Sequence, residues 1–261
     1  MIPISDENPT LRTPVMTLAI LAVTWAVWIL GQGALDGLLY STTQQGLSLA
    51  SSVCNWGLVP GELTHRAPLD FSIPIGPGMA CLVDNEARNW LTPVTSIFLH
   101  GSWGHIIGNS LYLWVFGNNI EDSMGRRKFL AFYLITGVVA ALTHIAIDPS
   151  SPVPTVGASG AVSGVMGAYL YLYPRVRVRT YFPPIFLFRL PAWAILILWF
   201  GMQVLTGLPQ LMMLDPKISG GVAVWAHVGG FVAGFLLIRS FHDPQLLRRR
   251  TAGGDAKVVW Q

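Results

Sequence analysis

An uncharged stretch at residues 153–173 reads VPTVGASGAVSGVMGAYLYLY. A helix needs about 20 mostly apolar residues to cross the hydrocarbon core of a bilayer, and this stretch is long enough. Gly160, Gly164 and Gly167 recur in it at helical spacing, which is typical of a face where two helices approach closely in lipid. The stretch therefore predicts a membrane helix whose small-residue face lies beside Ser159.

The composition of the whole chain indicates a membrane protein. Of its 261 residues, 52% are hydrophobic and only 11% are charged, whereas about a quarter of the residues in a soluble domain are charged. This balance excludes a disordered chain, a coiled coil and a soluble nucleic-acid-binding protein. Five further uncharged stretches are long enough to cross a bilayer, at residues 14–31, 98–117, 129–147, 190–208 and 218–238.

These six stretches predict an all-α fold, a polytopic bundle of six transmembrane helices. A membrane barrel would instead show shorter segments of alternating residues. We expect a cytoplasmic N-terminus at 1–13, a six-span domain at 14–240 with an extended outer loop at 32–97, and a basic cytoplasmic tail at 241–261. The first stretch has no basic leader before it, so we expect it to be retained and not cleaved.

The distribution of basic residues predicts the orientation in the membrane, because cytoplasmic connections carry the excess of Lys and Arg. With six spans, one side would hold all of the 16 basic residues except Arg66, Arg88 and Lys217. We therefore expect a multi-pass protein of the cell membrane with both termini in the cytoplasm. The arginine run at 248–250 is interpreted as a topology anchor and not as a nucleic-acid-binding patch.

Two cysteines, Cys54 and Cys81, both fall in the outer loop. If the orientation is right, they face the oxidising side of the membrane, where a disulfide is chemically allowed. Two unpaired thiols are an equally good reading of the sequence.

Polar residues inside apolar stretches are functional candidates, because each is costly at bilayer depth. The second stretch carries His100, His105 and Asn109, and the last two lie four residues apart, on one face of a helix. The fourth stretch carries Ser159 and the sixth carries His227. A serine and a histidine on separate helices are the two parts of a nucleophile and its general base.

The predicted spans place these groups at a similar depth. Counted from the outer end of each stretch, Ser159 is about six residues in, His105 seven, His227 nine and Asn109 eleven. Small residues then allow close approach of the two helices that carry the serine and the histidine. They form two matching faces, Gly160, Gly164 and Gly167 on one helix and Ala226, Gly230 and Gly234 on the other.

At this point the sequence resembles the rhomboid family of intramembrane serine proteases, over roughly residues 14 to 240. The resemblance is most specific in three segments: His105-x-x-x-Asn109, Gly157-x-Ser159-Gly160 and Ala226-His227-x-x-Gly230-x-x-x-Gly234. Supporting segments are Phe98-Leu99-His100, Gly117-Asn118-Asn119-Ile120-Glu121-Asp122 and Trp56-Gly57-Leu58-Val59-Pro60. Their order, spacing and placement on alternate spans make the match strong.

The resemblance implies hydrolysis of peptide bonds in single-span transmembrane proteins, near the outer membrane surface, by a Ser-His dyad. Ser159 would be the nucleophile and His227 its base, while Asn109, His105 and the backbone around Ser159 and Gly160 would stabilise the oxyanion. His100 would support the site or admit water. No Asp or Glu lies within any of the six stretches, which is consistent with a dyad that lacks an acid.

Two departures and several alternatives accompany this reading. Many family members have an aromatic residue four positions after the nucleophile, and here Ser163 occupies that place, which leaves the orientation of the His227 ring open. A non-catalytic membrane protein of the same fold that binds client proteins is the alternative function. No metal or other cofactor is expected, because no carboxylate or thiolate completes a ligand set with the histidines. The expected partners are transmembrane substrates and the lipid bilayer, with no nucleic acid.

Overall fold

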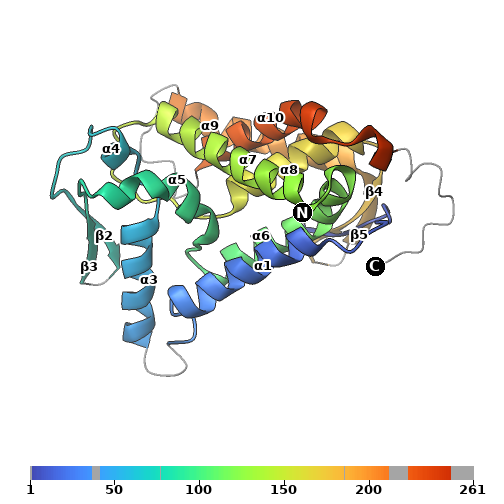
Figure 1. Cartoon of the computed structure of the whole chain (residues 1–261). Helices are drawn as coiled ribbons and strands as arrows, with labels where there is room; N and C mark the ends of the chain where they lie inside the picture. The colour runs from blue at the N-terminus through green and yellow to red at the C-terminus, as the bar shows by residue number, and fades with distance from the viewer. Residues whose placement is uncertain (1, 37–41, 77, 185, 212–222, 248–261) are drawn as a thin grey trace.

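The structure is a computed structural model that describes residues 2–36, 42–76, 78–184, 186–211 and 223–247. The predicted helical fold is confirmed in its main part, since most of the described chain is helical (Figure 1). Three described helices are long and apolar enough to cross a membrane: α7 (Arg126–Ile147), α9 (Ala192–Leu211) and α10 (Val224–Phe241). That the chain crosses the membrane six times remains a prediction. The other candidate helices are α1 (Val15–Ala26), which continues into a π-helical turn at Val27–Gly31, α6 (Trp103–Met124) and α8 (Ser159–Leu172).

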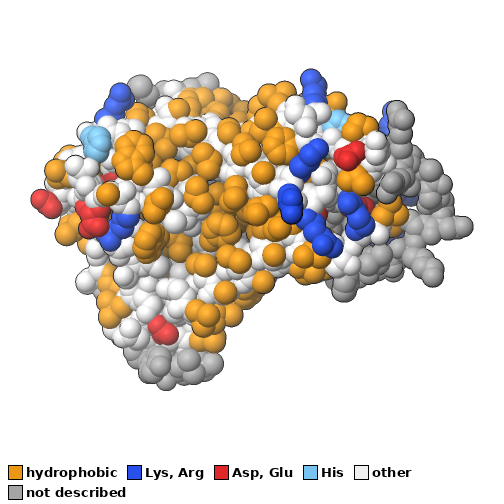
Figure 2. Space-filling model, viewed as in Figure 1, with side chains coloured by type: hydrophobic (Ala, Val, Ile, Leu, Met, Phe, Trp, Pro, Cys, Tyr) orange, Lys and Arg blue, Asp and Glu red, His pale blue; other side chains and the backbone are white. Residues whose placement is uncertain are grey.

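Helix α8 is the centre of the bundle. Its residues from Gly160 to Tyr169 are all buried, and α6, α7, α9 and α10 pack around it. A helix that is apolar or small on every side is suited to this position. Figure 2 shows hydrophobic side chains across the middle of one face of the molecule, with Lys and Arg side chains gathered toward one end. This pattern is typical of a surface that lies in a bilayer.

Contact between the backbones of α8 and α10 explains why these two helices have glycines where they meet. A Cβ atom on Gly230 would lie 2.1 Å from the carbonyl oxygen of Gly160, and one on Gly234 would lie 1.9 Å from that of Gly164. No side chain fits into such a contact. The predicted small-residue faces are therefore confirmed, and they allow the two helix backbones to touch.

The three helices that carry the candidate site residues, α6, α8 and α10, begin later than the apolar stretches do, which corrects the predicted depths. Residues 153–158 are not helical, because Thr155 pairs with Leu58 as an isolated β-bridge and Gly157 has a φ of +134°. Ser159 is consequently the first residue of α8, and His227 is the fourth of α10. Helix α6 is displaced along the sequence in the same direction: it begins at Trp103 and ends at Met124. It therefore includes Glu121 and Asp122, which lie beyond the predicted end at 117.

These two acidic residues connect α6 to the start of α1. The Glu121 carboxylate accepts hydrogen bonds from the backbone N–H groups of Met16 and Thr17, at 2.9 and 2.7 Å. The first N–H groups of a helix have no partner within that helix, so Glu121 acts as a cap supplied by another helix. Asp122 forms an ion pair with Arg12 at 2.9 Å. This end of the bundle is opposite to Ser159.

The same end carries a small antiparallel sheet that the sequence analysis did not predict. Its order is β1 (Ile2–Asp6), β4 (Arg177–Phe182) and β5 (Phe186–Pro191), and β4 and β5 form a hairpin between α8 and α9. The side chain of Asp6 joins the sheet to the bundle through hydrogen bonds from Tyr169 and Asn119, at 2.5 and 2.7 Å. The all-α class therefore holds for the bundle and not for the whole chain.

The predicted outer loop forms a segment at the other end of the bundle, which we call the outer segment and define as residues 42–98 (Figure 1). A disulfide joins Cys54 to Cys81, which settles the pairing that the sequence left open. Of the predicted basic tail, residues 248–261 lie outside the described residues, as does Lys217. The outer segment contains α3 (Thr42–Trp56), α4 (Pro60–Leu63), β2 (Ser72–Gly76), β3 (Met79–Leu82), α5 (Thr92–Thr95) and 3₁₀ turns at Ala87–Leu91 and Ser96–Phe98.

Candidate active site

Ser159 and His227 meet at the ends of two helices that touch. The Oγ atom of Ser159 lies 2.8 Å from Nε2 of His227, which is hydrogen-bond distance for a nucleophile and its base. Ser159 opens α8 and His227 lies in the first turn of α10. The backbone contact of Gly230 with Gly160 lies about one turn further along α10, so the glycine faces hold the two side chains together.

The second nitrogen of His227 contacts a glutamine that the sequence analysis did not single out. Nδ1 of His227 lies 2.9 Å from Oε1 of Gln203 on α9. A carbonyl oxygen can only accept, so Nδ1 carries the proton, and Nε2 is left free to accept from the Ser159 hydroxyl. Gln203 is a polar residue inside the apolar stretch 190–208, and the rule that selected His105 and Asn109 would have found it.

An aromatic ring packs against His227, and it comes from α9. The indole of Trp199 lies 5.8 Å from the imidazole, centroid to centroid. Ser163, at the place of the family's aromatic residue, instead donates its hydroxyl to the carbonyl oxygen of Ser159 at 2.6 Å. The question of how His227 is oriented without that aromatic residue is thus answered by Gln203 and Trp199.

The predicted residues of α6 lie on the other side of the serine. A Cβ atom on Gly157 would be 2.7 Å from Nε2 of His105, so the histidine ring lies directly against the loop that precedes Ser159. Nδ2 of Asn109 lies 2.9 Å from Nε2 of His100. Both His105 and Asn109 line the same cavity as the serine.

His100 is fully buried and stands behind Asn109. Its backbone N–H donates to Oε1 of Gln32 at 2.8 Å, and its carbonyl accepts from Nε2 of the same glutamine at 2.8 Å. Among the described residues that line the cavity, His100 is not included. His100 therefore lies behind Asn109, outside the lining of the cavity, and its supporting role stays a prediction.

The cavity joins these groups and has a volume of about 590 Å³. Its walls come from α6, α7, α8, α9 and α10, from the loops before α6 and α8, and from Leu58, Ser96 and Ile97 of the outer segment. None of its described lining residues is Asp or Glu. The first N–H groups of α8, including those of Ser159 and Gly160, have no partner within that helix and provide a partial positive charge at its start. The polar side chains that line the cavity are Ser96, Ser102, His105, Asn109, Tyr112, His144, Thr155, Ser159, Ser163, Gln203 and His227.

The bundle and this cavity define the chain as a polytopic helical membrane protein with a polar site inside it. The rhomboid domain, as a family model, matches residues 87–243, which is more than half of the chain. The chain therefore belongs to the rhomboid family, as the sequence motifs predicted.

Three relatives illustrate the extent of the similarity. The rhomboid protease GluP of Bacillus subtilis is 37% identical over 32% of this chain, which corresponds to only 16% of GluP. The putative rhomboid protease YdcA of the same organism is 29% identical over 62% of this chain and 71% of that protein. RHOMBOID-like protein 5 of Arabidopsis thaliana is 26% identical over 90% of this chain and 72% of that protein.

Proposed function

We propose that the protein is an intramembrane serine endopeptidase that cleaves transmembrane proteins with a Ser159-His227 dyad. The observation that carries this proposal is the 2.8 Å contact between Oγ of Ser159 and Nε2 of His227 inside a polar cavity of a membrane protein. A hydroxyl is a weak nucleophile unless a base takes its proton, and this contact supplies the base.

Acylation begins when Oγ of Ser159 attacks the scissile carbonyl carbon and its proton passes to Nε2 of His227. His227 then gives this proton to the leaving amine, which releases one half of the substrate. Water attacks the acyl-enzyme in the second half of the reaction, again with His227 as the base. The backbone contact of α8 with α10 keeps the two groups at working distance throughout.

The negative oxygen of the tetrahedral intermediate needs fixed donors. We assign this task to the His105 ring, the Asn109 amide and the first N–H groups of α8. An amide nitrogen carries two hydrogens, so Asn109 can bond to His100 with one and offer the other to the oxyanion. His105 lies against Gly157, two residues before the nucleophile, which supports the same role for its ring.

Gln203 is proposed as a positioning residue. Its carbonyl oxygen holds the Nδ1 proton of His227, so that Nε2 is the nitrogen that faces Ser159. In triads this place is taken by a carboxylate. A neutral amide fixes the tautomer in the same way but gives less stabilisation to the imidazolium that forms during the reaction.

The proposed substrates are single-span membrane proteins, cut near the outer surface of the cell membrane. A nucleophile at the start of a buried helix can attack only extended backbone, so the substrate helix must unwind there, and small residues allow it to do so. The orientation rests on the basic residues at the end of the bundle opposite Ser159, including Arg126, Arg127, Arg177 and Arg239. This end, and with it both termini, is proposed to be cytoplasmic.

A fluorophosphonate probe applied to the purified protein tests the proposal. We expect the native chain to be labelled and Ser159→Ala to lose the label. Ser163→Ala is the matched control, because its hydroxyl lies one helical turn away and bonds to its own helix. An unlabelled native chain, or a label that persists in Ser159→Ala, would favour the non-catalytic client-binding protein instead.

The oxyanion assignment has its own test. Asn109→Ala is expected to lower kcat by about 10²–10³ on a transmembrane substrate, because that is the usual cost of one oxyanion donor. A loss confined to KM would contradict the assignment of Asn109.

A further inference from the structure

The β4–β5 hairpin has two chemically different faces. Its register pairs Val178 with Leu190, Thr180 with Phe188 and Phe182 with Phe186. Successive side chains of a strand point to opposite sides, so the partners of each pair lie on one face. This aromatic face therefore consists of Val178, Thr180, Phe182, Phe186, Phe188 and Leu190. The opposite face, the arginine face, consists of Arg177, Arg179, Tyr181, Leu187, Arg189 and Pro191.

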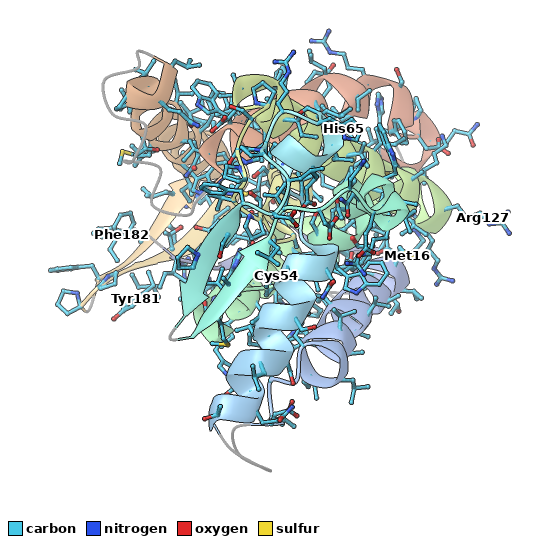
Figure 3. All side chains as sticks on the ribbon, turned by 90° about the vertical axis from the view of Figure 1, so that its left-hand side faces the viewer. Met16, Cys54, His65, Arg127, Tyr181 and Phe182 are labelled. Carbon is cyan, nitrogen blue, oxygen red and sulfur yellow. A yellow bond between two sulfur atoms is a disulfide. The ribbon has the colours of Figure 1, made fainter. Side chains whose placement is uncertain are left out.

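The aromatic face is buried at its base and bare at its tip. Val178 and Thr180 are fully buried, whereas Phe186 is 56% exposed and Phe188 46% exposed. The rings of Phe186 and Phe188 stack with their centroids 6.2 Å apart, and Phe182 meets Phe188 edge to face at 5.5 Å. Figure 3 shows the hairpin, labelled at Tyr181 and Phe182, projecting sideways from the helices. One continuous apolar face thus leaves the protein interior and has no protein cover at its end.

The position of the hairpin indicates what covers it. β4 follows the end of α8 and β5 runs directly into α9, a helix long and apolar enough to cross the membrane. Trp193 and Ile197, in the first two turns of α9, are 49% and 51% exposed and extend the apolar surface from β5 along the helix. Because the lipid-facing surface of α9 begins where β5 ends, the hairpin lies at the boundary between hydrocarbon and headgroups.

The charges on the opposite face complement a lipid surface. Arg179 and Arg189 lie 3.9 and 3.6 Å from the carboxylate of Glu7, and Arg177 is on the same face. Two of the three guanidinium groups on this face approach the one carboxylate, so the face keeps a net positive charge. Basic side chains next to a membrane are attracted to anionic headgroups, and aromatic rings beside them are suited to the interface.

We propose that the β4–β5 hairpin is an interfacial anchor: its aromatic face inserts into the acyl boundary of the leaflet at the end of the bundle opposite Ser159, and its arginine face binds anionic phospholipid headgroups. The anchor holds the α8–α9 connection in the plane of the membrane. It is independent of whether the chain cleaves substrates.

Spin labels on the two faces test the proposal. The native cysteines form a disulfide, so a single new thiol can be labelled in Phe188→Cys or in Leu187→Cys, its neighbour on the arginine face. Both full-length variants are placed in vesicles of phosphatidylcholine and phosphatidylglycerol. At position 188 we expect strong relaxation by oxygen and several-fold weaker relaxation by a water-soluble nickel chelate. At position 187, which is 59% exposed, we expect the reverse order.

Each other outcome overturns the anchor. If nickel relaxes both labels equally, both faces are in water. If neither reagent reaches position 188, a protein surface such as a second copy covers it. The headgroup part is tested with Arg177→Gln/Arg179→Gln/Arg189→Gln. Replacing phosphatidylglycerol by phosphatidylcholine should raise nickel access at position 188 in the protein with native arginines and change it much less in this triple variant. An equal response of the two would exclude binding of anionic headgroups.

Discussion

The α8–α10 pair and the outer segment are held together in opposite ways. In the pair, glycines allow backbone to touch backbone, and a Cβ atom on Gly234 would lie within 1.9 Å of a carbonyl oxygen. The outer segment instead depends on the Cys54–Cys81 disulfide and on polar anchors such as Glu62, whose carboxylate accepts from the N–H of Asp84 at 3.2 Å. Helices in lipid can exploit packing over a long face, whereas a short irregular segment cannot.

This difference indicates where each region tolerates change. A change at the glycine contact moves Ser159 relative to His227, because both are attached to the same two backbones. A change at the disulfide of the outer segment is expected to loosen that segment and to leave the distance between the two groups as it is, because neither cysteine lines the cavity, whereas Leu58 and Ser96 of the same segment do.

The largest effect is expected from Gly234→Leu. A side chain there must push α10 away from α8, and overpacking against backbone should cost about 3 kcal/mol or more of unfolding free energy. Fluorophosphonate labelling should fall to the level of Ser159→Ala. Gly201→Leu on α9 is the matched control, because a Cβ atom on Gly201 meets nothing within 4 Å. Equal loss in both variants would mean that the glycine contact has no special role.

The next effect is expected in the outer segment. Replacing both cysteines, as Cys54→Ser/Cys81→Ser, opens a loop with a sequence separation of 27. By the loop-entropy relation this should lower the stability of the segment by about 3.5 kcal/mol. Limited proteolysis should then cut between residues 42 and 98 much faster, while the labelling of Ser159 stays. Loss of labelling together with faster proteolysis would show that the two regions are not separate.

A smaller effect is expected from Gln203. Gln203→Met keeps the length of the side chain but removes the acceptor for Nδ1 of His227, and one hydrogen bond of about 1 kcal/mol corresponds to a roughly five-fold fall in kcat. Gln203→Glu keeps an acceptor and should restore most of the rate. KM should not change in either variant. If Met and Glu behave alike, Gln203 only fills space.

The smallest effect is a pH dependence of stability that is confined to the outer segment. Burial raises the pKa of Glu62 from 4.5 to about 7, and the nearby charge of Asp84 adds to it. Between pH 4.5 and about 7, the carboxyl group of Glu62 therefore keeps its proton in the folded protein and loses it in the unfolded chain. The contribution of Glu62 to stability is complete below pH 4.5 and is lost as the pH rises toward about 7. Proteolysis of the segment should be faster at pH 8 than at pH 5, and Glu62→Gln should reduce this difference. An unchanged difference would rule out Glu62 as its origin.

The sequence predicted the contacts of the bundle better than its boundaries. The glycine faces of α8 and α10, and with them the pairing of Ser159 with His227, follow from residue type and spacing alone. The start of α8 does not follow from residue type and spacing. The segment from Val153 to Ala158 is as apolar as a membrane helix, but it is held by a β-bridge to Leu58, about a hundred residues earlier. Only the fold brings such segments together.

The strands and Gln203 were missed for different reasons. The sequence of β4, Arg177-Val-Arg-Thr-Tyr-Phe182, alternates between charged or polar and apolar residues, and this period of two indicates a strand. The sequence does not indicate that β4 pairs with β1, which is more than 170 residues away. Gln203 was visible as a polar residue within an apolar stretch, but its partner could not be named, because that depends on how α9 packs beside α10.

The cap on α1 also constrains the order of assembly during synthesis. Thr17 leaves the ribosome 104 residues before Glu121, which at about 5–20 residues per second is a delay of roughly 5–20 s. Throughout that interval the first N–H groups of α1 have only water to bond to, so this helix end stays at the aqueous interface. Helix α1 thus reaches its final place only after α6, which is made later, has arrived.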